Sequence, residues 1–351
     1  PLEHRRSLLL TFSFITAALS AGLVYGWPAL RRNLITNEQS TLTESQLGLI
    51  FTVGSWSTQG GRFFAGLARD RISGTRVTTC VCLLVTLGGV VGIALCGENN
   101  AIGLSISMFC MGIGSGATLC LQPVAGLFPL ELQGSILATI SGLDQSSGVI
   151  FLLLIAISTN RRESFGTFAV VLGLILLVAY RMLPKENFVK LEAVKENDIE
   201  DESSSENKDT EDYTDSSDMS TEDSISNYVA PMDMPNVVDQ IKSSEYSLLL
   251  LWLSTQLIPL QYYVATIGFQ LERKGDDDGT YTNVFTLMFA ASAIVSPLIG
   301  KFIDTTGLGI AQGVSTILSS ASLVFLGLRS VTLGAHVFGM CCYSVARNMI
   351  F

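Results

Sequence analysis

Charged residues are scarce in this chain. Of its 351 residues only 15% are Asp, Glu, Lys or Arg, whereas a soluble globular protein carries roughly 25%. Histidine occurs twice, and the seven cysteines lie in or beside apolar stretches without partners at zinc-ligand spacing. These shortages argue against a soluble enzyme and against a metal site. We therefore predict no enzymatic activity, no metal and no cofactor.

Two recognisable segments are also missing. No Walker phosphate-binding loop is present, so the sequence does not support ATP-driven chemistry. The first apolar stretch runs into Trp27-Pro28 and Arg31-Arg32 and lacks a small-residue cleavage site, which argues against a cleavable signal peptide. The chain begins without Met and stops at Phe351 inside an apolar run, so we expect it to continue beyond both ends.

The acidic residues are concentrated in one segment. Residues 185–245 hold 18 Asp and Glu against 5 Lys, a net charge of −13, so the remainder carries about +3 of the overall −10. The segment has almost no apolar content, and such a chain cannot bury enough surface to offset the entropy lost on ordering. We predict a disordered cytoplasmic linker at 185–245 between an amino-terminal domain, 1–184, and a carboxy-terminal domain, 246–351.

Long apolar stretches dominate the rest. About 20 apolar residues in a helix cross a bilayer core of ~30 Å, and only helices or closed barrels satisfy their backbone groups in lipid. These stretches are too continuous for barrel strands. We predict an all-α membrane protein of the 6+6 plan in which the last two helices are missing. The ten stretches are 7–30, 45–67, 77–97, 101–126, 133–158, 165–183, 246–271, 283–303, 309–328 and 334–351.

A short loop is repeated after the second and eighth stretches. Each copy has a Gly, an Asp four residues later and then a turn Gly. The first copy comprises Gly66, Asp70, Arg71, Ser73, Gly74 and Arg76, and the second comprises Gly300, Asp304 and Gly307. The pattern resembles the signature loop of the major facilitator superfamily, although the first copy shifts its Gly and the second lacks the Arg. The resemblance implies two six-helix halves that transport by alternating access.

The same loops are candidate gates. Arg71 and Arg76 are expected to pair with acids across the cytoplasmic gap, with Glu131 as one partner. These pairs would hold the cytoplasmic side closed in one state of the transporter and break in the other. Alternatively these arginines only set topology. Lys and Arg are slightly more numerous on the side that holds the amino terminus, both loops and the linker, which predicts that this side is cytoplasmic.

A closer resemblance is carried by residues 22–30 (GLVYGWPAL), 47–55 (LGLIFTVGS) and 281–285 (YTNVF), together with the Gln-rich seventh stretch. These look like solute carrier family 43, the facilitators of large neutral amino acids, and related transporters of apicomplexan parasites. The resemblance implies uniport or exchange of amino acids, in the plasma membrane or alternatively an endomembrane or vacuole. An amino acid and the lipid bilayer are the implied partners. We expect no nucleic acid, and a monomer suffices.

The substrate is expected near the midplane between the two halves. In the first stretch Pro28 has no backbone N–H, so we expect the carbonyl one turn earlier to lack its helical hydrogen bond and to be free to accept from a ligand. Gly26 and Trp27 beside it are binding candidates. Alternatively, Trp27 is an anchor at the membrane interface and Pro28 kinks the helix there. In the seventh stretch Gln256 and Tyr263 share a helix face with Trp252, and Gln261 adds a further polar group. These groups line a pocket or form interhelical hydrogen bonds.

Three ionisable residues fall inside predicted spans, where a charge is costly unless it is paired or hydrated. Asp144 is expected to bind an ammonium group or carry a proton, or else to pair permanently with Arg62 or Arg347. Arg347 is expected to receive a carboxylate. A facilitative amino acid transporter is the first prediction. The alternatives are a proton-coupled carrier of another small organic solute and a membrane nutrient sensor that does not transport.

Overall fold

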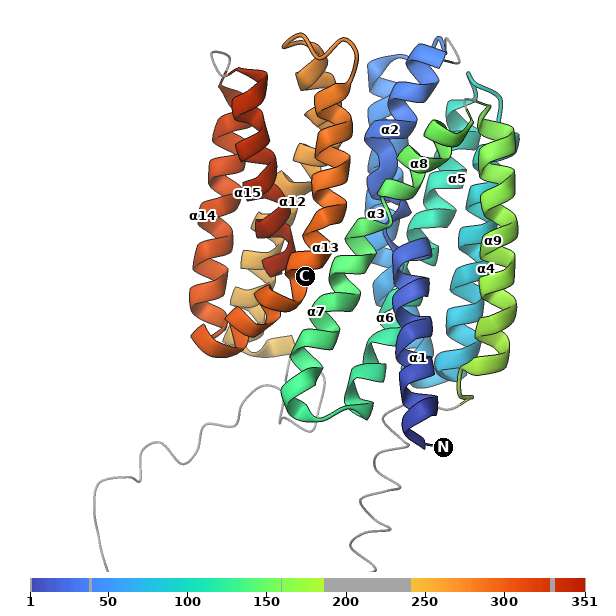
Figure 1. Ribbon diagram of the computed structural model, residues 1–351, viewed down its shortest axis with the longest axis vertical. Coiled ribbons are helices and arrows are strands. Elements are labelled where there is room, and N and C mark those ends of the chain that lie inside the picture. The colour runs from blue at the N-terminus through green and yellow to red at the C-terminus, as the bar shows by residue number, and fades with distance from the viewer. Residues whose placement is uncertain (1, 38–39, 159, 186–240, 329–331, 351) are drawn as a thin grey trace, which may run out of the picture. The chain divides into compact units, whose positions relative to one another are not determined.

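The structure is a computed structural model that describes residues 2–37, 40–158, 160–185, 241–328 and 332–350 (Figure 1). These residues form helices and turns, and no strand occurs among them, which confirms the all-helical prediction. The amino-terminal helices are α1 (Leu2–Thr16), η1 (Ala17–Ala21), η2 (Leu23–Gly26), α2 (Trp27–Arg32), η3 (Asn33–Asn37), α3 (Glu44–Ala68), η4 (Arg69–Ser73), α4 (Gly74–Leu95), α5 (Ala101–Gly114), α6 (Gly116–Leu121), η5 (Gln122–Leu127), α7 (Leu130–Ser146), α8 (Val149–Ile157) and α9 (Arg161–Met182). The later ones are α12 (Ser244–Glu272), α13 (Thr280–Thr306), α14 (Leu308–Gly327) and α15 (Leu333–Ile350).

The chain forms two compact units. The first contains residues 1–192 and 259–351, and the second contains residues 193–258. Within the second unit, the structure describes residues 241–258, which include the beginning of α12. Residues 186–240, most of the predicted acidic linker, lie outside the described residues. The division into an amino-terminal bundle, a linker and a carboxy-terminal bundle therefore stays a prediction.

Most of the long helices are suited to a membrane. Seven helical stretches of the described residues are long and apolar enough to cross one, and an eighth is the pair Arg5–Ala21 and Leu23–Thr36, which meet at a 46° bend. One stretch, Glu44–Leu95, runs for 52 residues and contains both α3 and α4. The chain is thus a multi-pass membrane protein. The predicted tenth span corresponds to α15, which is not among these stretches, and the 6+6 count stays a prediction.

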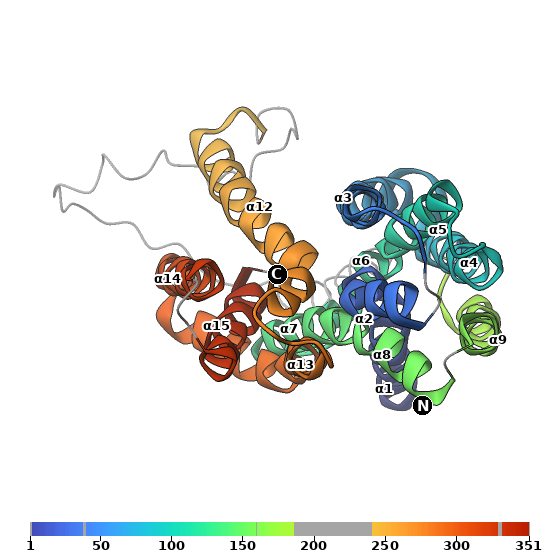
Figure 2. The same ribbon diagram turned by 90° about the horizontal axis from the view of Figure 1, so that it is seen from above.

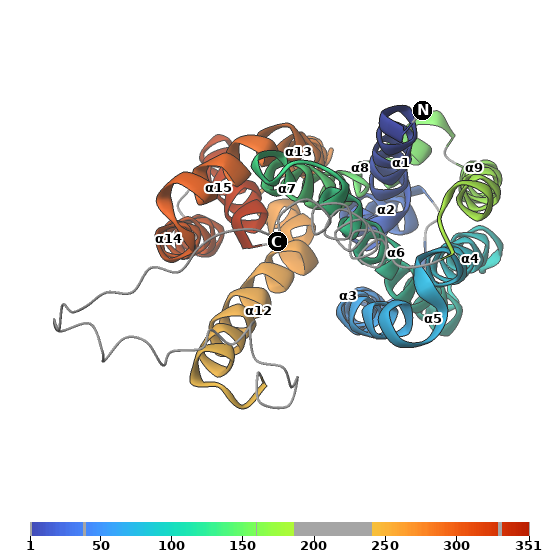
Figure 3. The same ribbon diagram turned by 90° about the horizontal axis from the view of Figure 1, so that it is seen from below.

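Close packing of helices organises the first unit. In its amino-terminal part α5 packs against α3 and α4, and α9 packs against α4 (Figure 2). A Cβ added at Gly114 would lie 2.7 Å from the Cys82 carbonyl oxygen, and one at Gly116 would lie 2.8 Å from that of Gly61. Small residues therefore let α5 and α6 approach the backbones of both neighbours. In the carboxy-terminal part, α13 and α14 both pack against α15 (Figure 3).

The pairing of α7 with α13 joins the two parts of the first unit. Figures 2 and 3 show these helices side by side. A Cβ on Gly300 of α13 would lie 3.0 Å from the Cβ of Ala138 and 3.3 Å from the carbonyl oxygen of Gly134. Gly300, which the repeated loop made a gating candidate, thus lies at a close helix contact.

The two copies of the repeated loop end in the same kind of turn. Gly74 begins α4 with φ 68° and ψ 177°, and Gly307 precedes α14 with φ 85° and ψ 156°. Only glycine adopts this region without steric cost. The shifted Gly of the first copy is therefore equivalent to the turn Gly of the second, and the loop is repeated in geometry as well as in sequence.

Candidate functional site

The first span is interrupted beside α7. The helix changes from η1 to η2 at Gly22, whose backbone N–H donates to the Ser147 hydroxyl over 2.6 Å. The Ser147 hydroxyl donates in turn to the Asp144 carbonyl over 2.8 Å. A side chain thus satisfies the backbone donor that the break exposes. The arrangement fixes Tyr25 of η2 near the end of α7, where Asp144 lies.

Asp144 forms a buried ion pair with Arg62 of α3. The Asp144 residue is 5% exposed, and Arg62 donates to its Oδ2 atom. The other oxygen, Oδ1, is buried and makes no hydrogen bond. Of the two partners that the sequence left open, Arg62 is therefore the one in direct contact. Asp144 keeps one acceptor atom available.

Arg347 lies in an aromatic cage contributed by several elements. The residue is 1% exposed, and its Nη1 atom donates to the Tyr343 hydroxyl over 3.1 Å. Its guanidinium carbon lies 4.1 Å from the centre of the Tyr25 ring and 5.3 Å from that of Phe289. Tyr343 donates onward to the Leu260 carbonyl over 3.0 Å. Cation–π contacts therefore help to hold the charge.

An aromatic wall continues from this cage into α12. The Tyr263 ring stacks on Tyr343 with centroids 4.3 Å apart and an interplanar angle of 13°. Phe285 lies 5.8 Å from Tyr263 and 5.9 Å from Phe289, measured between ring centroids. These rings are buried against one another beside the charge of Arg347 on α15. Tyr263 thus contacts Tyr343, which hydrogen-bonds Arg347, and a role for Tyr263 in binding stays a prediction.

Polar groups without partners surround the same region. The hydroxyl of Tyr25 is buried and makes no hydrogen bond, and neither does the side-chain amide of Gln145 on α7. Leaving such a group unpaired costs about 1–3 kcal/mol. We refer to Tyr25, Arg62, Asp144, Gln145, Phe289, Tyr343 and Arg347 as the central cluster. Sequence reasoning missed Gln145, although an amide inside an apolar stretch next to Asp144 was a usable signal.

Gly26 and Trp27 are packed against neighbouring helices, and a role for either in binding stays a prediction. A Cβ on Gly26 would lie 2.7 Å from the Gly148 carbonyl oxygen, so Gly26 packs against the beginning of α8. Trp27 is 1% exposed, with its ring centroid 6.3 Å from that of Phe51, so it packs in the core rather than at a membrane interface. Pro28 lies in the first turn of α2. There it removes no helical hydrogen bond, and the expected freed carbonyl does not arise from it.

The two predicted glutamines of α12 fall in different places. Gln261 lies in the first unit, where both atoms of its amide group are buried without a hydrogen-bond partner. Gln256 is 9% exposed and lies in the second unit. Gln261 has the unsatisfied polar character of a ligand-binding side chain. A role for either glutamine in binding stays a prediction.

The charged loop of η4 makes contacts on its own side of the protein. Asp70 receives two hydrogen bonds from the neighbouring Arg69, at 2.7 and 3.2 Å, and Arg69 also donates to the Leu119 carbonyl over 3.0 Å. Arg76 donates to the Leu183 carbonyl after α9 over 2.6 Å, and Arg71 is exposed. Among the described side chains, the expected pairs of Arg71 and Arg76 with acids across the gap are not formed. Arg76 donates to the Leu183 carbonyl oxygen instead of to an acidic side chain.

Other members of the repeated loops bear on packing or lie outside the described side chains. A Cβ on Gly66 would lie 3.1 Å from the Leu119 side chain, so this residue lies where α3 approaches α6. The side chains of Asp304 and Glu131 are not among those described. Gating by the repeated loops stays a prediction.

Ionic contacts between the two parts of the first unit gather at the end away from η4. Arg31 of α2, with a side chain 5% exposed, contacts Glu44 of α3 and Glu272 of α12, each over 2.9 Å. The neighbouring Arg32 donates to the Asp277 carbonyl over 3.5 Å. We call Arg31, Glu44 and Glu272 the ionic latch. Sequence reasoning counted Arg31 only as a topology signal, because the partner on α12 lies far along the chain.

The connection between α12 and α13 is anchored at the same end. Asp276 accepts hydrogen bonds from the backbone N–H groups of Tyr281 and Thr282, at 3.0 and 2.9 Å. Lys274 donates to the carbonyl oxygens of Leu326 and Leu328, at 2.9 and 3.0 Å. Partial burial lowers the pKa of the Lys274 ammonium. These bonds hold Glu272 in place for its contact with Arg31.

Comparison with known proteins places this arrangement. The family model described as Major Facilitator Superfamily matches residues 6–351. The fold is similar to the proton:xylose symporter XylE bound to 6-bromo-6-deoxy-D-glucose (TM-score 0.62, 14% identity, covering 98% of this chain and 81% of that one). It is also similar to the inward-open xylose transporter XylE from E. coli (TM-score 0.56, 14% identity, 97% and 79%).

A mutant form of the nucleoside transporter NupG is another structure of similar fold (TM-score 0.62, 10% identity, 97% and 80% coverage). No curated protein sequence matches the chain. At these identities the solved structures support the fold, and the substrate has to be argued from the side chains.

Proposed function

Because this chain belongs to the major facilitator superfamily, we propose that it carries an amino acid across a membrane by alternating access, with the central cluster as its binding site. The observation that supports this substrate class is the charge of the cluster. Arg62 and Arg347 contribute two positive charges, and Asp144 contributes one negative charge. Buried side chains of both signs can each meet one end of a zwitterion, whose carboxylate and ammonium groups carry opposite charges.

The chemistry of the cluster complements a zwitterion. A substrate carboxylate binds the Arg347 guanidinium, which has the planar donor geometry that carboxylates favour. A substrate ammonium group donates to Asp144 Oδ1, which makes no other hydrogen bond. An apolar side chain packs on the wall of Tyr263 and Phe285. These complementary groups favour a large neutral amino acid, moved by uniport or exchange and, as the resemblance implies, at the plasma membrane.

Reconstituted transport tests this proposal. Liposomes containing the purified chain should take up labelled L-leucine more than labelled xylose or uridine. Replacing Arg347 by Met should lower uptake by at least tenfold, because a charge-assisted hydrogen bond contributes about 1.5–3 kcal/mol. Arg181→Met, at an exposed site on α9, is the matched control and should leave uptake unchanged. Preference for xylose or uridine over leucine would reject the amino acid assignment.

The Arg62–Asp144 ion pair favours a second function, the proton-coupled carriage of another small organic solute. A buried carboxylate held by an arginine can exchange a proton for its partner during a transport cycle. Uptake measured with and without a pH gradient separates the two functions. Leucine uptake that ignores the gradient would reject coupling, whereas gradient-driven uptake of a solute other than an amino acid would favour the second function.

A further inference from the structure

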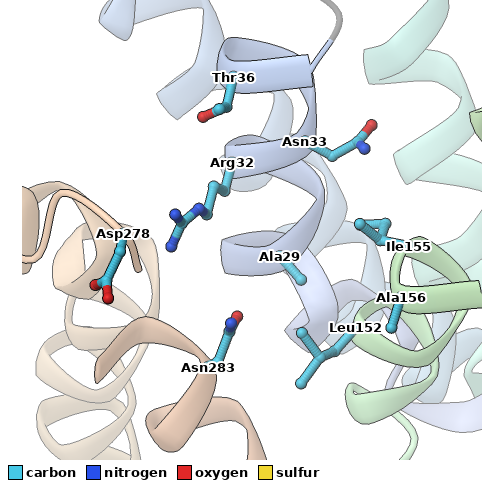
Figure 4. A pocket seen from close by; sticks show the side chains of 9 residues that line it. All are labelled: Ala29, Arg32, Asn33, Thr36, Leu152, Ile155, Ala156, Asp278 and Asn283. Atoms are coloured by element: carbon cyan, nitrogen blue, oxygen red, sulfur yellow. The ribbon is translucent and has the colours of Figure 1, made fainter. Parts of the chain in front are cut away.

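A pocket lies at the same end of the first unit as the ionic latch. Its volume is about 280 Å³, and it lies between α2, η3, α8 and the beginning of α13. Figure 4 shows the side chains that surround it. They are Ala29, Arg32, Asn33, Thr36, Leu152, Ile155, Ala156, Asp278 and Asn283. None of these residues belongs to the central cluster.

One wall of the pocket carries polar groups that lack partners. Asn33 is 3% exposed, yet neither atom of its side-chain amide makes a hydrogen bond. The Nη1 atom of Arg32 is also buried and unbonded. Each such group is unfavourable when it is left unpaired, because it has lost its bonds to water. The Asn33 amide therefore offers a donor and an acceptor to a polar ligand.

The facing wall supplies a negative charge. The Asp278 carboxylate accepts hydrogen bonds from the Thr280 backbone N–H and hydroxyl, at 3.1 and 2.8 Å. These bonds, with a smaller contribution from the positive charge of Arg32, lower the pKa of Asp278. Figure 4 shows the Arg32 guanidinium directed toward Asp278 across the pocket. The carboxylate is therefore ionised at neutral pH and is placed opposite a cation.

We propose that this pocket is a second binding site for a small zwitterionic solute, occupied before the solute reaches the central cluster; the proposal rests on the proposed function. The solute carboxylate is recognised by the Arg32 guanidinium, and the buried Asn33 amide offers a further hydrogen bond on the side of α8. The solute's ammonium group is recognised by Asp278. Its apolar side chain lies on Leu152 and Ile155 of α8. The pocket would thus bind the solute with the same three kinds of group as the central cluster: a guanidinium, a carboxylate and an apolar wall.

The first span runs from the pocket to the central cluster. Asn33, Ala29 and Tyr25 follow one another along it, in η3, α2 and η2. At 1.5 Å per residue, the pocket lies roughly 12 Å along the axis from Tyr25. Ala29 lines the pocket, and Tyr25 belongs to the central cluster. A solute that moves from the pocket along the first span meets the cluster next.

The neighbouring helices continue the same route. Four residues before Leu152 lies Gly148, which closely approaches Tyr25, since an added Cβ would lie 3.3 Å from the Tyr25 Cβ. Six residues after Asn283 lies Phe289, whose ring meets that of Tyr25 at a centroid distance of 5.9 Å. Gly148 thus packs against the edge of the central cluster, to which Tyr25 and Phe289 belong, between the pocket and Arg347. The pocket is a loading site on the far side of this contact.

Equilibrium binding of labelled L-leucine to the purified chain in lipid-free detergent tests the loading site. Wild type should bind two leucines per chain, and Arg347→Met should retain one weakly bound leucine. Ala156→Trp should remove that weak site by filling the pocket from an exposed position on α8. Leu153→Trp, on the same helix but outside the pocket and 52% exposed, is the matched control. Asn33→Leu tests the polar wall directly and should weaken the same site.

In transport, Ala156→Trp should raise KM by about three- to tenfold, the loss expected when one hydrogen-bonded contact to the solute is blocked, while kcat changes little. Suppose that the wild-type chain binds one leucine, that Arg347→Met binds none, and that wild-type leucine uptake is intact. This result would overturn the loading site and leave the proposed transport function standing. No uptake while Arg347→Met still binds leucine would overturn the function alone. Neither uptake nor binding would overturn both.

A lipid headgroup has the same zwitterionic chemistry, and the lipid environment separates the two sources. The binding experiment is repeated in nanodiscs that contain phosphatidylethanolamine. Weak leucine binding that persists there supports a solute site. Its loss would assign the pocket to the headgroup and overturn the proposal.

Discussion

At the scale of single residues, the functional argument depends on Asp144, Arg62 and Arg347. Their presence inside apolar stretches was visible in the sequence, and the cost of a charge in lipid marked each one as a candidate. Which of them touch was not visible, because Arg62 and Asp144 are 82 positions apart. The ion pair leaves Asp144 Oδ1 without a hydrogen bond. Arg347 adds a second guanidinium, which lies over the ring of Tyr25.

Removing the charge of Asp144 alone should be costly. Asp144→Asn leaves the partly buried Arg62 guanidinium, 19% exposed, without its counter-ion, and breaking such a pair costs at most about 3–5 kcal/mol. We expect a lower midpoint of thermal unfolding in detergent and a loss of leucine uptake. The double variant Arg62→Gln/Asp144→Asn should recover part of the stability and none of the uptake. Intact uptake with unchanged pH dependence in Asp144→Asn would remove this residue from the site and from coupling.

At the scale of elements, breaks and turns place the site. The interruption at Gly22 lets Ser147 bond to the first span and brings Tyr25 to α7. The sequence predicted a carbonyl freed by Pro28, or alternatively a kink there, but Pro28 lies in the first turn of α2. Proline is favourable in a first turn and disruptive in the middle of a helix, and the two cases look alike until the helix boundaries are known. The repeated turn, in contrast, was readable from its glycines alone.

The turn glycines should be sensitive to a single methyl group. Gly74→Ala and Gly307→Ala place a Cβ at positive φ, 68° and 85°, which costs about 1–2 kcal/mol per residue. Each should lower the midpoint of thermal unfolding and the yield of monodisperse protein. Gly309→Ala, where an added Cβ meets nothing within 4 Å, is the control and should be neutral or slightly stabilising. Equal effects at all three positions would contradict the role of the turn.

At the scale of the whole molecule, the described ion pairs that join distant parts of the first unit include the latch at the end away from η4. Arg31, Glu44 and Glu272 connect α2 and α3 to α12. For a carrier with alternating access, such a contact stabilises the state in which this end is closed. The prediction from sequence placed the gate at the η4 end. There, Arg69 and Arg76 donate to backbone carbonyls.

Weakening the latch should open its end of the protein. Glu272→Gln removes one of the two carboxylates that hold Arg31, and a loss of about 1.4 kcal/mol shifts a two-state population tenfold. A cysteine introduced at Ala29, which is 5% exposed, should then react faster with an impermeant maleimide.

Glu163→Gln, at an exposed acid in the first turn of α9, is the control for the loss of one charge and should leave the rate unchanged. An unchanged rate in Glu272→Gln as well would show that the latch does not control access at this end.

The sequence by itself determined that the chain lies in a membrane, that it is helical, and that a charged loop is repeated after the second and eighth stretches. These properties follow from local composition. About twenty apolar residues in a helix are long enough to cross a membrane, and a glycine permits a turn with positive φ, whatever the rest of the chain does. Only the tertiary structure decided which charges meet. Arg62 contacts Asp144, and Arg31 contacts Glu272, which lies 241 positions away in the sequence. Asn33 lies in a pocket with an apolar wall. Such contacts depend on how the helices pack, which no local pattern encodes.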